Sequence, residues 1–444
     1  MDILLKEKET KLFFKYLIPA VTGTLAIGIL IFIDTMFIGR GVGAKGLAAL
    51  NIVLPAFTFY SCVGYLLGVG GATVASIDEG SGGSTKKRIF TTCVLIGLTI
   101  SAVFVIVQNI YLDEIVRLLG AKGDILPLAK SYLRVVVYAS GLYLMPHILN
   151  PFVRNDNNPN LTMIGMVVCG IVNLTLDYIF IFIFNWGMAG AAIATGIAQL
   201  SYTLILCLHF FKKDRKLGLE KVDIRVEDIK RVITVGLSSF INEISSGLII
   251  FIFNLYLLRL SGELSVSVYS IIININYLVY LVYMGVGQAI QPLVSYNYGS
   301  KKLKRVNNFL KLGLVFNITY AIIVLLIFFT KSGLIISLFN KDNEELRLLT
   351  EKNILKYFSS TIFTGINIVI ATYIQAQGQG KTSSIIMFLR AFLFMVIGVV
   401  ILSKLFGENG VWYTTLFSEV LTFTGLMIWM KKDFERRKKW GNSN

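Results

Sequence analysis

Four acidic side chains stand inside long apolar stretches of the sequence, and they are the residues best placed to do chemistry. An aspartate at the centre of a helix in hydrocarbon costs about 2.5–3.5 kcal/mol even on lenient insertion scales, so each acid needs a protein-lined, hydrated or ion-occupied setting. A carboxylate in such a setting can bind a proton or a cation. The four acids are Asp34, Asp177, Glu243 and Glu419.

The most informative spacing surrounds Asp177. Asn173 precedes it by one helical turn and shares its face. Thr195 and Asp177 are each nine residues from Trp186, the turn of a predicted hairpin, so both are expected about 13 Å from that turn. Asp34 reaches the same region from the first apolar stretch. Two carboxylates, an amide oxygen and a hydroxyl suit Na⁺ or a shared proton; an Asp–Asn hydrogen bond that only fixes the hairpin is the alternative.

The other two acids carry weaker signals. Glu243 lies near the middle of its apolar stretch and is interpreted as a second protonation site or a contact for a cationic substrate. A structural hydrogen bond to a neighbouring helix explains it equally well. Glu419 has no supporting spacing, and we expect a structural role. Arg390 and Lys356 are candidate counter-charges, although both stand where long side chains can reach the membrane interface.

Several amides within apolar stretches are expected to face a central cleft. For each one taken alone, an ordinary hydrogen bond between helices is the better explanation. Asn274 and Gln288 join Glu243 in the predicted substrate or second protonation site. The full set of amides is Asn51, Asn274, Asn276, Gln288 and Gln291.

The elements that position these side chains are membrane helices. Of 444 residues, 55% are hydrophobic and 15% charged, against roughly 25% charged in soluble domains. A spanning helix needs about 20 mostly apolar residues, whereas porin-like strands would alternate. We therefore predict an all-α polytopic membrane protein with twelve transmembrane helices at 12–39, 47–76, 89–112, 127–150, 161–184, 187–211, 232–258, 266–295, 308–330, 353–376, 384–405 and 411–430.

The net charge of +16 is distributed unevenly across these helices. With the N-terminus taken as cytoplasmic, about 26 Lys and Arg fall in connections and tails on that side and about 10 on the other, the bias of a membrane protein with both termini inside. We therefore expect a multi-pass protein of the plasma membrane whose basic loop and tail face anionic headgroups. Nucleic acid is not expected as a partner.

The two halves of the chain repeat each other. The stretch 68–72 resembles 285–289, each late in the second helix of its half, and 154–159 has a counterpart in 375–380. Six helices per half insert both halves the same way up, as in transporters that rock one half against the other. The predicted domains are an N-terminal lobe over 1–211, a cytoplasmic linker over 212–231, and a C-terminal lobe with a basic tail over 232–444.

Motifs for other chemistries fail on inspection. Residues 41–46 match GxGxxG but follow a membrane helix rather than a strand, and 380–382 has no companion nucleotide domain. His147 and His209 lack the context of a zinc site. The four cysteines all fall inside spans and act as small apolar residues. We find no nucleophile–base constellation and predict no enzyme activity and no catalytic residue.

The residues resemble a known family, the multidrug and toxic compound extrusion (MATE) transporters, and in particular the MepA-like branch. The segment 32–39 around Asp34 and the connection 154–160 carry part of the resemblance. The most specific part is 171–181 with 190–195, which contains Asn173, Asp177 and Thr195. Support from the second half comes from Gln291-Pro292 and from 295–299.

The resemblance implies two six-helix lobes around a V-shaped cleft, and export of cationic amphipathic compounds by antiport with H⁺ or Na⁺. It implies that Asp34, Asn173, Asp177 and Thr195 form the cation-coupling site, a possible Na⁺ site, and that Glu243 matches an acidic position of NorM-type members. The acid that those members carry in the tenth helix is missing, since 353–376 has no Asp or Glu. A coupling site in the second lobe is therefore in doubt.

The expected partners are small organic cations and the lipid bilayer, and the expected state is a monomer. No cofactor is expected beyond the coupling ion, and a role in antibiotic resistance follows from the family. Two alternatives stay open. A flippase for a lipid-linked precursor would share the fold but needs a strongly cationic cleft, and an ion channel would belong to a different class.

Overall fold

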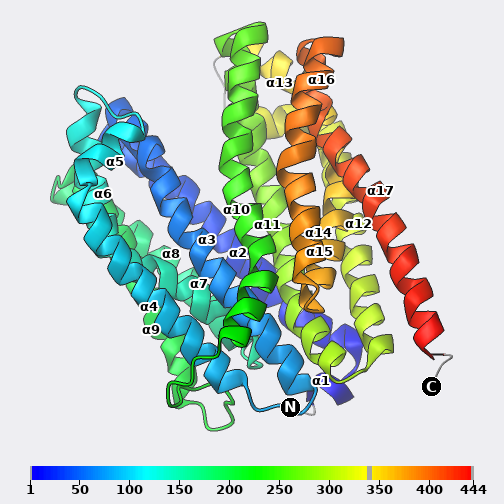
Figure 1. Ribbon diagram of the computed structural model, residues 1–444. Helices are drawn as coiled ribbons and strands as arrows, with labels where there is room; N and C mark the ends of the chain where they lie inside the picture. Colours follow the sequence, from blue (N-terminus) through cyan, green and yellow to red (C-terminus); the bar gives the residue numbers. More distant parts are fainter. Residues whose placement is uncertain (1–2, 338–342, 442–444) are drawn as a thin grey trace.

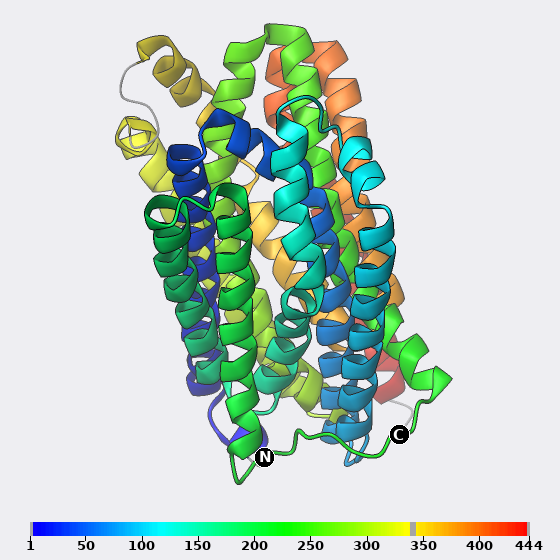
Figure 2. The same cartoon turned by 90° about the vertical axis from the view of Figure 1, so that its left-hand side faces the viewer.

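The computed structural model describes residues 3–337 and 343–441, and this part of the chain is helical without a strand. The end of the predicted basic tail, residues 442–444, lies outside the described residues. The predicted all-α class is confirmed. Figure 1 shows the helices in two groups that diverge away from the end carrying both termini, and Figure 2 shows the same arrangement from the side.

The first group is the N-terminal lobe, and its helices follow the predicted spans with ends displaced by a few residues. They are α1 (Ile3–Lys6), α2 (Glu9–Gly41), α3 (Ala44–Gly80), α4 (Lys86–Ile110), α5 (Leu112–Leu118), α6 (Ile125–Tyr138), α7 (Ser140–Asn155), α8 (Pro159–Asp177), the π-helix η1 (Tyr178–Ile183), α9 (Gly187–Cys207) and the 3₁₀ helix η2 (Leu208–Phe211).

The second group is the C-terminal lobe. Its elements are α10 (Val226–Ser261), α11 (Glu263–Gly299), α12 (Leu303–Ser337), α13 (Glu344–Phe358), α14 (Thr361–Ala376), α15 (Gly380–Phe388), the π-helix η3 (Leu389–Leu393), α16 (Phe394–Phe406) and α17 (Glu408–Gly441). Because α10 begins at Val226, the last residues of the predicted linker 212–231 are already helical.

Two spans that the sequence predicts as single helices are broken. Within the described residues, ten helices are long and apolar enough to cross a membrane, and two bent pairs raise the number to twelve. The pairs are α6 with α7, bent by 54°, and α13 with α14, bent by 41°. Each pair is the fourth span of its half, and η1 and η3 each lie in the fifth span. The halves therefore share their irregularities as well as their order.

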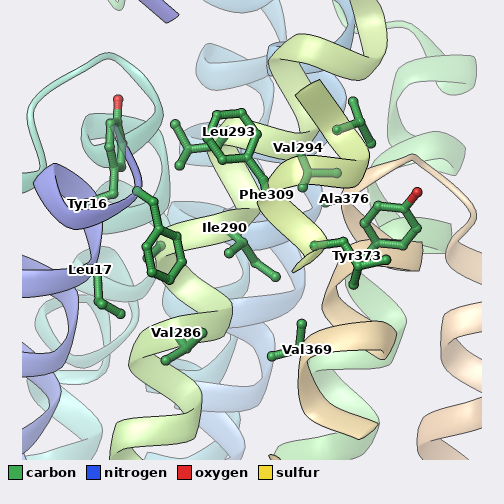
Figure 3. Packing of buried hydrophobic residues seen from close by; sticks show 14 of the residues in the cluster. Tyr16, Leu17, Val286, Ile290, Leu293, Val294, Phe309, Val369, Tyr373 and Ala376 are labelled. Atoms are coloured by element: carbon green, nitrogen blue, oxygen red, sulfur yellow. The ribbon is translucent and has the colours of Figure 1, made fainter. Parts of the chain in front are cut away.

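Helix α2 packs against both lobes. Near its N-terminus Tyr16 and Leu17 belong to an apolar cluster with residues of α11, α12 and α14, among them Leu293 and Phe309 (Figure 3). Further along, α2 packs against α8 of the N-terminal lobe. A displacement of the C-terminal half of α2 would therefore act on helices of both lobes.

Glycines bring the two lobes together near the end that carries the termini. A methyl group added at any of four glycines would collide with a backbone carbonyl of the opposite lobe: Gly70 and Gly80 of α3, Gly236 of α10 and Gly299 of α11. We call this contact the glycine seam. At these four positions it brings α3 against α10 and α11 almost backbone to backbone.

The linker docks on the N-terminal lobe through one aspartate. The carboxylate of Asp156 accepts a hydrogen bond from the Lys86 ammonium. Its Oδ2 lies 2.7 Å from Nε2 of His209 and accepts hydrogen bonds of 3.0 Å from the backbone N–H groups of Lys216 and Leu217. Burial opposes ionisation of Asp156, but the hydrogen bond from His209 and the positive charge of Lys86 outweigh it and hold the pKa of this carboxyl well below its usual value.

Candidate functional site

A cavity of about 460 Å³ lies between the two lobes. This volume falls within the range of about 300–1,000 Å³ found for small-molecule sites. The cavity wall includes α2, α7, α8 and α9 of the first lobe together with α10 and α11 of the second. Motion of one lobe against the other would therefore change the shape of the cavity.

Asp34 and Asp177 lie side by side, as the sequence analysis expected. Asp34 lines the cavity, whereas Asp177 is 0% exposed and lies behind it. Neither oxygen of Asp177 nor Oδ1 of Asp34 has a hydrogen-bond partner among the described residues, and no Lys or Arg of that part of the chain forms an ion pair with them. The half-buried carboxyl group of Asp34 and the fully buried one of Asp177 thus meet without a counter-charge from the described chain.

Asn173 and Thr195 complete this region, with a shift from the predicted register. Both line the cavity, and the Asn173 amide donates to the Thr195 hydroxyl at 3.4 Å. The sequence predicted instead that Thr195 lies at the same membrane depth as Asp177, which follows Asn173 by one turn of α8. The π-helix η1 begins directly after Asp177 and separates it from the hairpin turn, so simple α-helical counting does not hold there.

Tyr132 of α6 was not singled out from the sequence, although it belongs to the same region. It lines the cavity, is 4% exposed, and lies close to Thr195 and to both carboxyl groups. A tyrosine in an apolar stretch has no distinctive spacing. No signal in a single sequence separates it from a core aromatic.

Glu243 lines the cavity from α10. Tyr65 and Tyr277 lie near its carboxyl group, and its neighbour Asn242 accepts a hydrogen bond of 3.1 Å from Tyr280. No ion pair joins Glu243 to a Lys or Arg of the described chain. A carboxyl group surrounded by aromatic rings is a suitable receptor for an organic cation.

The predicted amides divide into two groups. Asn51, Gln288 and Gln291 line the cavity. Asn274 does not, and this corrects its place in the predicted substrate site. Its side chain is exposed and donates to the carbonyl of Ser270 in its own helix at 2.8 Å. The helical turn of α11 carries Asn274 away from the cavity, and its amide is satisfied locally; Asn276 does not line the cavity either.

Glu419 is held by a buried ion pair, in keeping with the structural role expected for it. Arg390 donates to both of its oxygens at 2.8–3.0 Å, and Asn367 donates a further bond at 2.6 Å. Arg390 and Glu419 are each about 5% exposed. Of the two candidate counter-charges, Arg390 is the one that pairs with an acid. Lys356 donates hydrogen bonds to Asn353 and Asn409 instead.

One cavity residue escaped the sequence analysis because of its position. Arg154 was counted in a connection between helices, yet α7 continues to Asn155 and places the guanidinium on the cavity wall. It donates to Gln288 of the second lobe at 2.8 Å. It is therefore part of the contact between lobes.

Metal chemistry has little support in the described residues. They contain no group of three or more His, Cys, Asp or Glu that could hold a metal ion. His147 lies 3.2 Å from the hydroxyl of Ser61, and His209 lies in the cluster around Asp156. The oxygen set around Asp34 and Asp177 would accommodate a hard monovalent cation or a proton rather than a transition metal.

Comparison with known proteins finds a matching family and relatives that cover most of the chain. The MatE family model matches residues 19–179 and 239–400. Multidrug export protein MepA of Staphylococcus saprophyticus is 27% identical over 93% of this chain and 91% of its own length, and MepA of Staphylococcus aureus (strain MRSA252) is 26% identical over 95% and 94%.

Solved structures agree on the fold. A crystal structure of MATE in complex with MaL6 has a TM-score of 0.92 at 21% identity and covers 98% of this chain and 99% of its own. An outward-facing multidrug resistance MATE family transporter of the MOP superfamily also has a TM-score of 0.92, at 20% identity over 98% of both chains. With both halves of the chain matched by the family model, this membrane protein belongs to the MatE family.

Proposed function

We propose that this chain is a multidrug exporter that moves cationic amphipathic molecules out of the cell by antiport with H⁺ or Na⁺. The observation that carries the proposal is the pair of adjacent carboxyl groups, Asp34 on the wall of an inter-lobe cavity and Asp177 buried behind it, without a counter-charge on the described chain. The names of the MepA relatives support export as the direction of transport.

The coupling ion and the substrate would use different walls of the same cavity. H⁺ or Na⁺ would bind at Asp34 and Asp177, with oxygens from Asn173 and Thr195. The organic cation would lie against Glu243. Two like charges side by side disfavour each other strongly, so cation or proton binding lowers the free energy of the pair.

Helix α2 connects the ion site to the rest of the molecule. Asp34 stands in its far half, and its near half is packed into the second lobe. Pro19 and Gly23 lie between these two parts and weaken the helix, because proline removes a backbone hydrogen bond. Neutralising the two acids would allow α2 to bend, which would reduce the cavity and release the drug.

The energy available is adequate for export. One elementary charge crossing 100 mV supplies about 2.3 kcal/mol, which is about a fiftyfold concentration ratio if fully coupled. A channel would dissipate such a gradient, and single-channel recording distinguishes the two classes. A flippase for a lipid-linked precursor is not favoured, because the cavity wall carries two carboxyl groups and one guanidinium.

The test is uptake of a cationic dye, the ethyl ester of rhodamine B, into liposomes containing the purified protein. Na⁺ and H⁺ gradients are imposed separately, and one of them is expected to drive uptake. Asp34→Asn is expected to abolish the driven component. The matched control is Asp113→Asn, an exposed acid far from the cavity in α5. Driven uptake by Asp34→Asn at the wild-type rate would remove this mechanism.

We also propose that the chain is a monomer in the plasma membrane with both termini cytoplasmic. The charge bias of the connections supports the orientation. The cavity lies within one copy of the chain, so no second copy is needed to complete it. Labelling of single introduced cysteines from each side of the membrane tests the orientation, and mass determination in detergent tests the monomer.

A further inference from the structure

Arg154 is a buried cation whose hydrogen bonds are incomplete. It is 3% exposed, lines the cavity, and lies at the end of α7. Its Nη1 donates to the amide oxygens of Asn150 at 3.3 Å and Gln288 at 2.8 Å, whereas its buried Nε has no hydrogen-bond partner among the described residues. A guanidinium with five donors rarely stays buried on two neutral acceptors, since burying a charge without compensation is costly.

The chain supplies no acid to Arg154. No ion pair within the described residues includes it. The acid next to it in sequence, Asp156, is already bound by Lys86, His209 and two backbone N–H groups of the linker. The described chain therefore gives this guanidinium no counter-charge, and the space next to it is the cavity.

The equivalent position in the second half of the chain shows which side chain is sufficient for folding there. The turns after α7 and α14 both carry a left-handed residue, Asn157 with φ of 61° and Gly378 with φ of 78°. Counting back three residues from each leads to Arg154 and Gln375. Gln375 donates to the carbonyl of Val235 and to the hydroxyl of Ser239, both at 2.9 Å. A neutral amide thus satisfies the position in the second lobe, so the charge of Arg154 is additional to the needs of the fold.

We infer that Arg154 binds an anionic group, a carboxylate, of the transported molecule. This inference rests on the proposed export function and specifies its substrate class as amphoteric. The cationic centre of such a molecule would lie against Glu243 and its carboxylate against Arg154, on the walls of one cavity. Arginine presents two parallel N–H donors to the two oxygens of a carboxylate, which gives orientation as well as affinity.

The test compares two dyes that differ at one group. Rhodamine B carries a cationic xanthene and a free carboxylate, and its ethyl ester keeps the cation but loses the anion. Binding of each dye to the purified protein in neutral detergent is measured by fluorescence anisotropy without any ion gradient. The variants are Arg154→Gln, which reproduces the second lobe, and Arg154→Lys, which keeps the charge. Arg117→Gln, an exposed arginine of α5, is the matched control.

Wild-type protein is expected to bind the acid more tightly than the ester. Arg154→Gln should weaken binding of the acid by roughly tenfold to a hundredfold, the range for a hydrogen bond to a charged group, with little change for the ester. Arg154→Lys should keep part of the preference, and Arg117→Gln all of it. Equal weakening of both dyes by Arg154→Gln, or no weakening, would overturn the inference.

Two further measurements keep the outcome decisive. If Arg154→Gln does not fold, the wild type alone decides, because tighter or equal binding of the ester contradicts a carboxylate receptor. A lipid phosphate offers similar oxygens, so phosphatidylglycerol is titrated as a competitor; its displacement of the acid but not the ester would assign Arg154 to a lipid headgroup instead. Ion-driven uptake of the ester tests the proposed export function separately.

Discussion

The fifth span of each lobe contains a π-helix next to a buried acid, but the two acids have different partners. In the C-terminal lobe Arg390, within η3, donates to both oxygens of Glu419, and Asn367 adds a further bond. In the N-terminal lobe Asp177, directly before η1, meets Asp34 and no counter-charge of the described chain.

Under the proposed antiport, this difference assigns ion exchange to the N-terminal lobe. A guanidinium attached to the chain neutralises Glu419, so that site offers no unpaired negative charge to a mobile cation. The pair in the first lobe lacks such a group on the described chain and, in the proposed mechanism, would depend on an ion that arrives and leaves. The missing acid in 353–376 fits the same division, because the tenth span offers no carboxyl group to pair with Glu419.

The largest expected effect comes from removing the exchangeable charge. Asp177→Asn should reduce gradient-driven dye uptake by at least about a hundredfold, comparable to the loss of a group that acts directly in the process, while the folded protein remains as abundant as wild type. No donor of the described residues bonds to Asp177, whose neighbour is the Asp34 carboxyl group, so folding should be unaffected. Uptake in liposomes and size-exclusion profiles are the measurements. Retained coupling in this variant would erase the distinction between the lobes.

Breaking the fixed pair should act on stability instead. Glu419→Gln leaves Arg390 buried without its counter-charge, and loss of one partner of such a pair costs about 3–5 kcal/mol. We expect a much lower midpoint of thermal unfolding in detergent. Replacing both residues by apolar ones, Arg390→Met with Glu419→Leu, should restore stability and keep ion-coupled uptake. Loss of coupling in the stable double variant would show that the second lobe also takes part in exchange.

Glu243 should influence the substrate more than the ion. Glu243→Gln is expected to weaken binding of the rhodamine B ethyl ester by roughly tenfold, about 1.4 kcal/mol, because the organic cation loses its carboxyl contact. The dependence of uptake on the imposed ion gradient should keep its shape. Equilibrium binding and uptake at several ion concentrations measure the two properties. A changed ion dependence would instead make Glu243 a second protonation site.

The smallest expected effect is at Tyr132, beside the acid pair. Tyr132→Phe removes one hydroxyl near Thr195 and the two carboxyl groups, and we expect about a threefold to tenfold shift in the coupling-ion concentration that gives half-maximal uptake, the range of a single neutral hydrogen bond. Tyr269→Phe, a buried tyrosine of the second lobe, is the control. An equal effect of both variants would indicate loss of packing rather than a contribution to the ion site.

Much of the fold was predictable from apolarity alone. Twelve spans and two similar halves follow from where hydrocarbon can surround the chain. The ends of the helices were less accessible, as the start of α10 at Val226 shows, because apolarity marks the membrane rather than the helix. The bends and the π-helices were not predicted, since a change in backbone hydrogen bonding leaves no trace in hydropathy.

Residues of the candidate site were predictable from the sequence where their insertion into hydrocarbon has a high free-energy cost. An aspartate in hydrocarbon is expensive, and this singled out Asp34 and Asp177. Arg154 was missed because its neighbours Asn155 and Asp156 made the segment resemble a solvated connection. Asn274 was wrongly directed to the cleft because a polar residue on a helix with several exposed faces does not reveal which face meets the other lobe.

The glycine seam has a consequence for the free energy of separating the lobes. Each large side chain pulled out of a packed core costs about 1.5–3 kcal/mol in lost burial, but contacts between glycines involve mainly backbone atoms. At Gly70, Gly80, Gly236 and Gly299, α3 therefore contacts α10 and α11 through the backbone, while the Arg231–Asp78 ion pair and the Gln291–Thr73 hydrogen bond also cross the seam. Under the proposed transport cycle, opening the seam would therefore remove little apolar side-chain burial at these four positions and would break these two polar contacts.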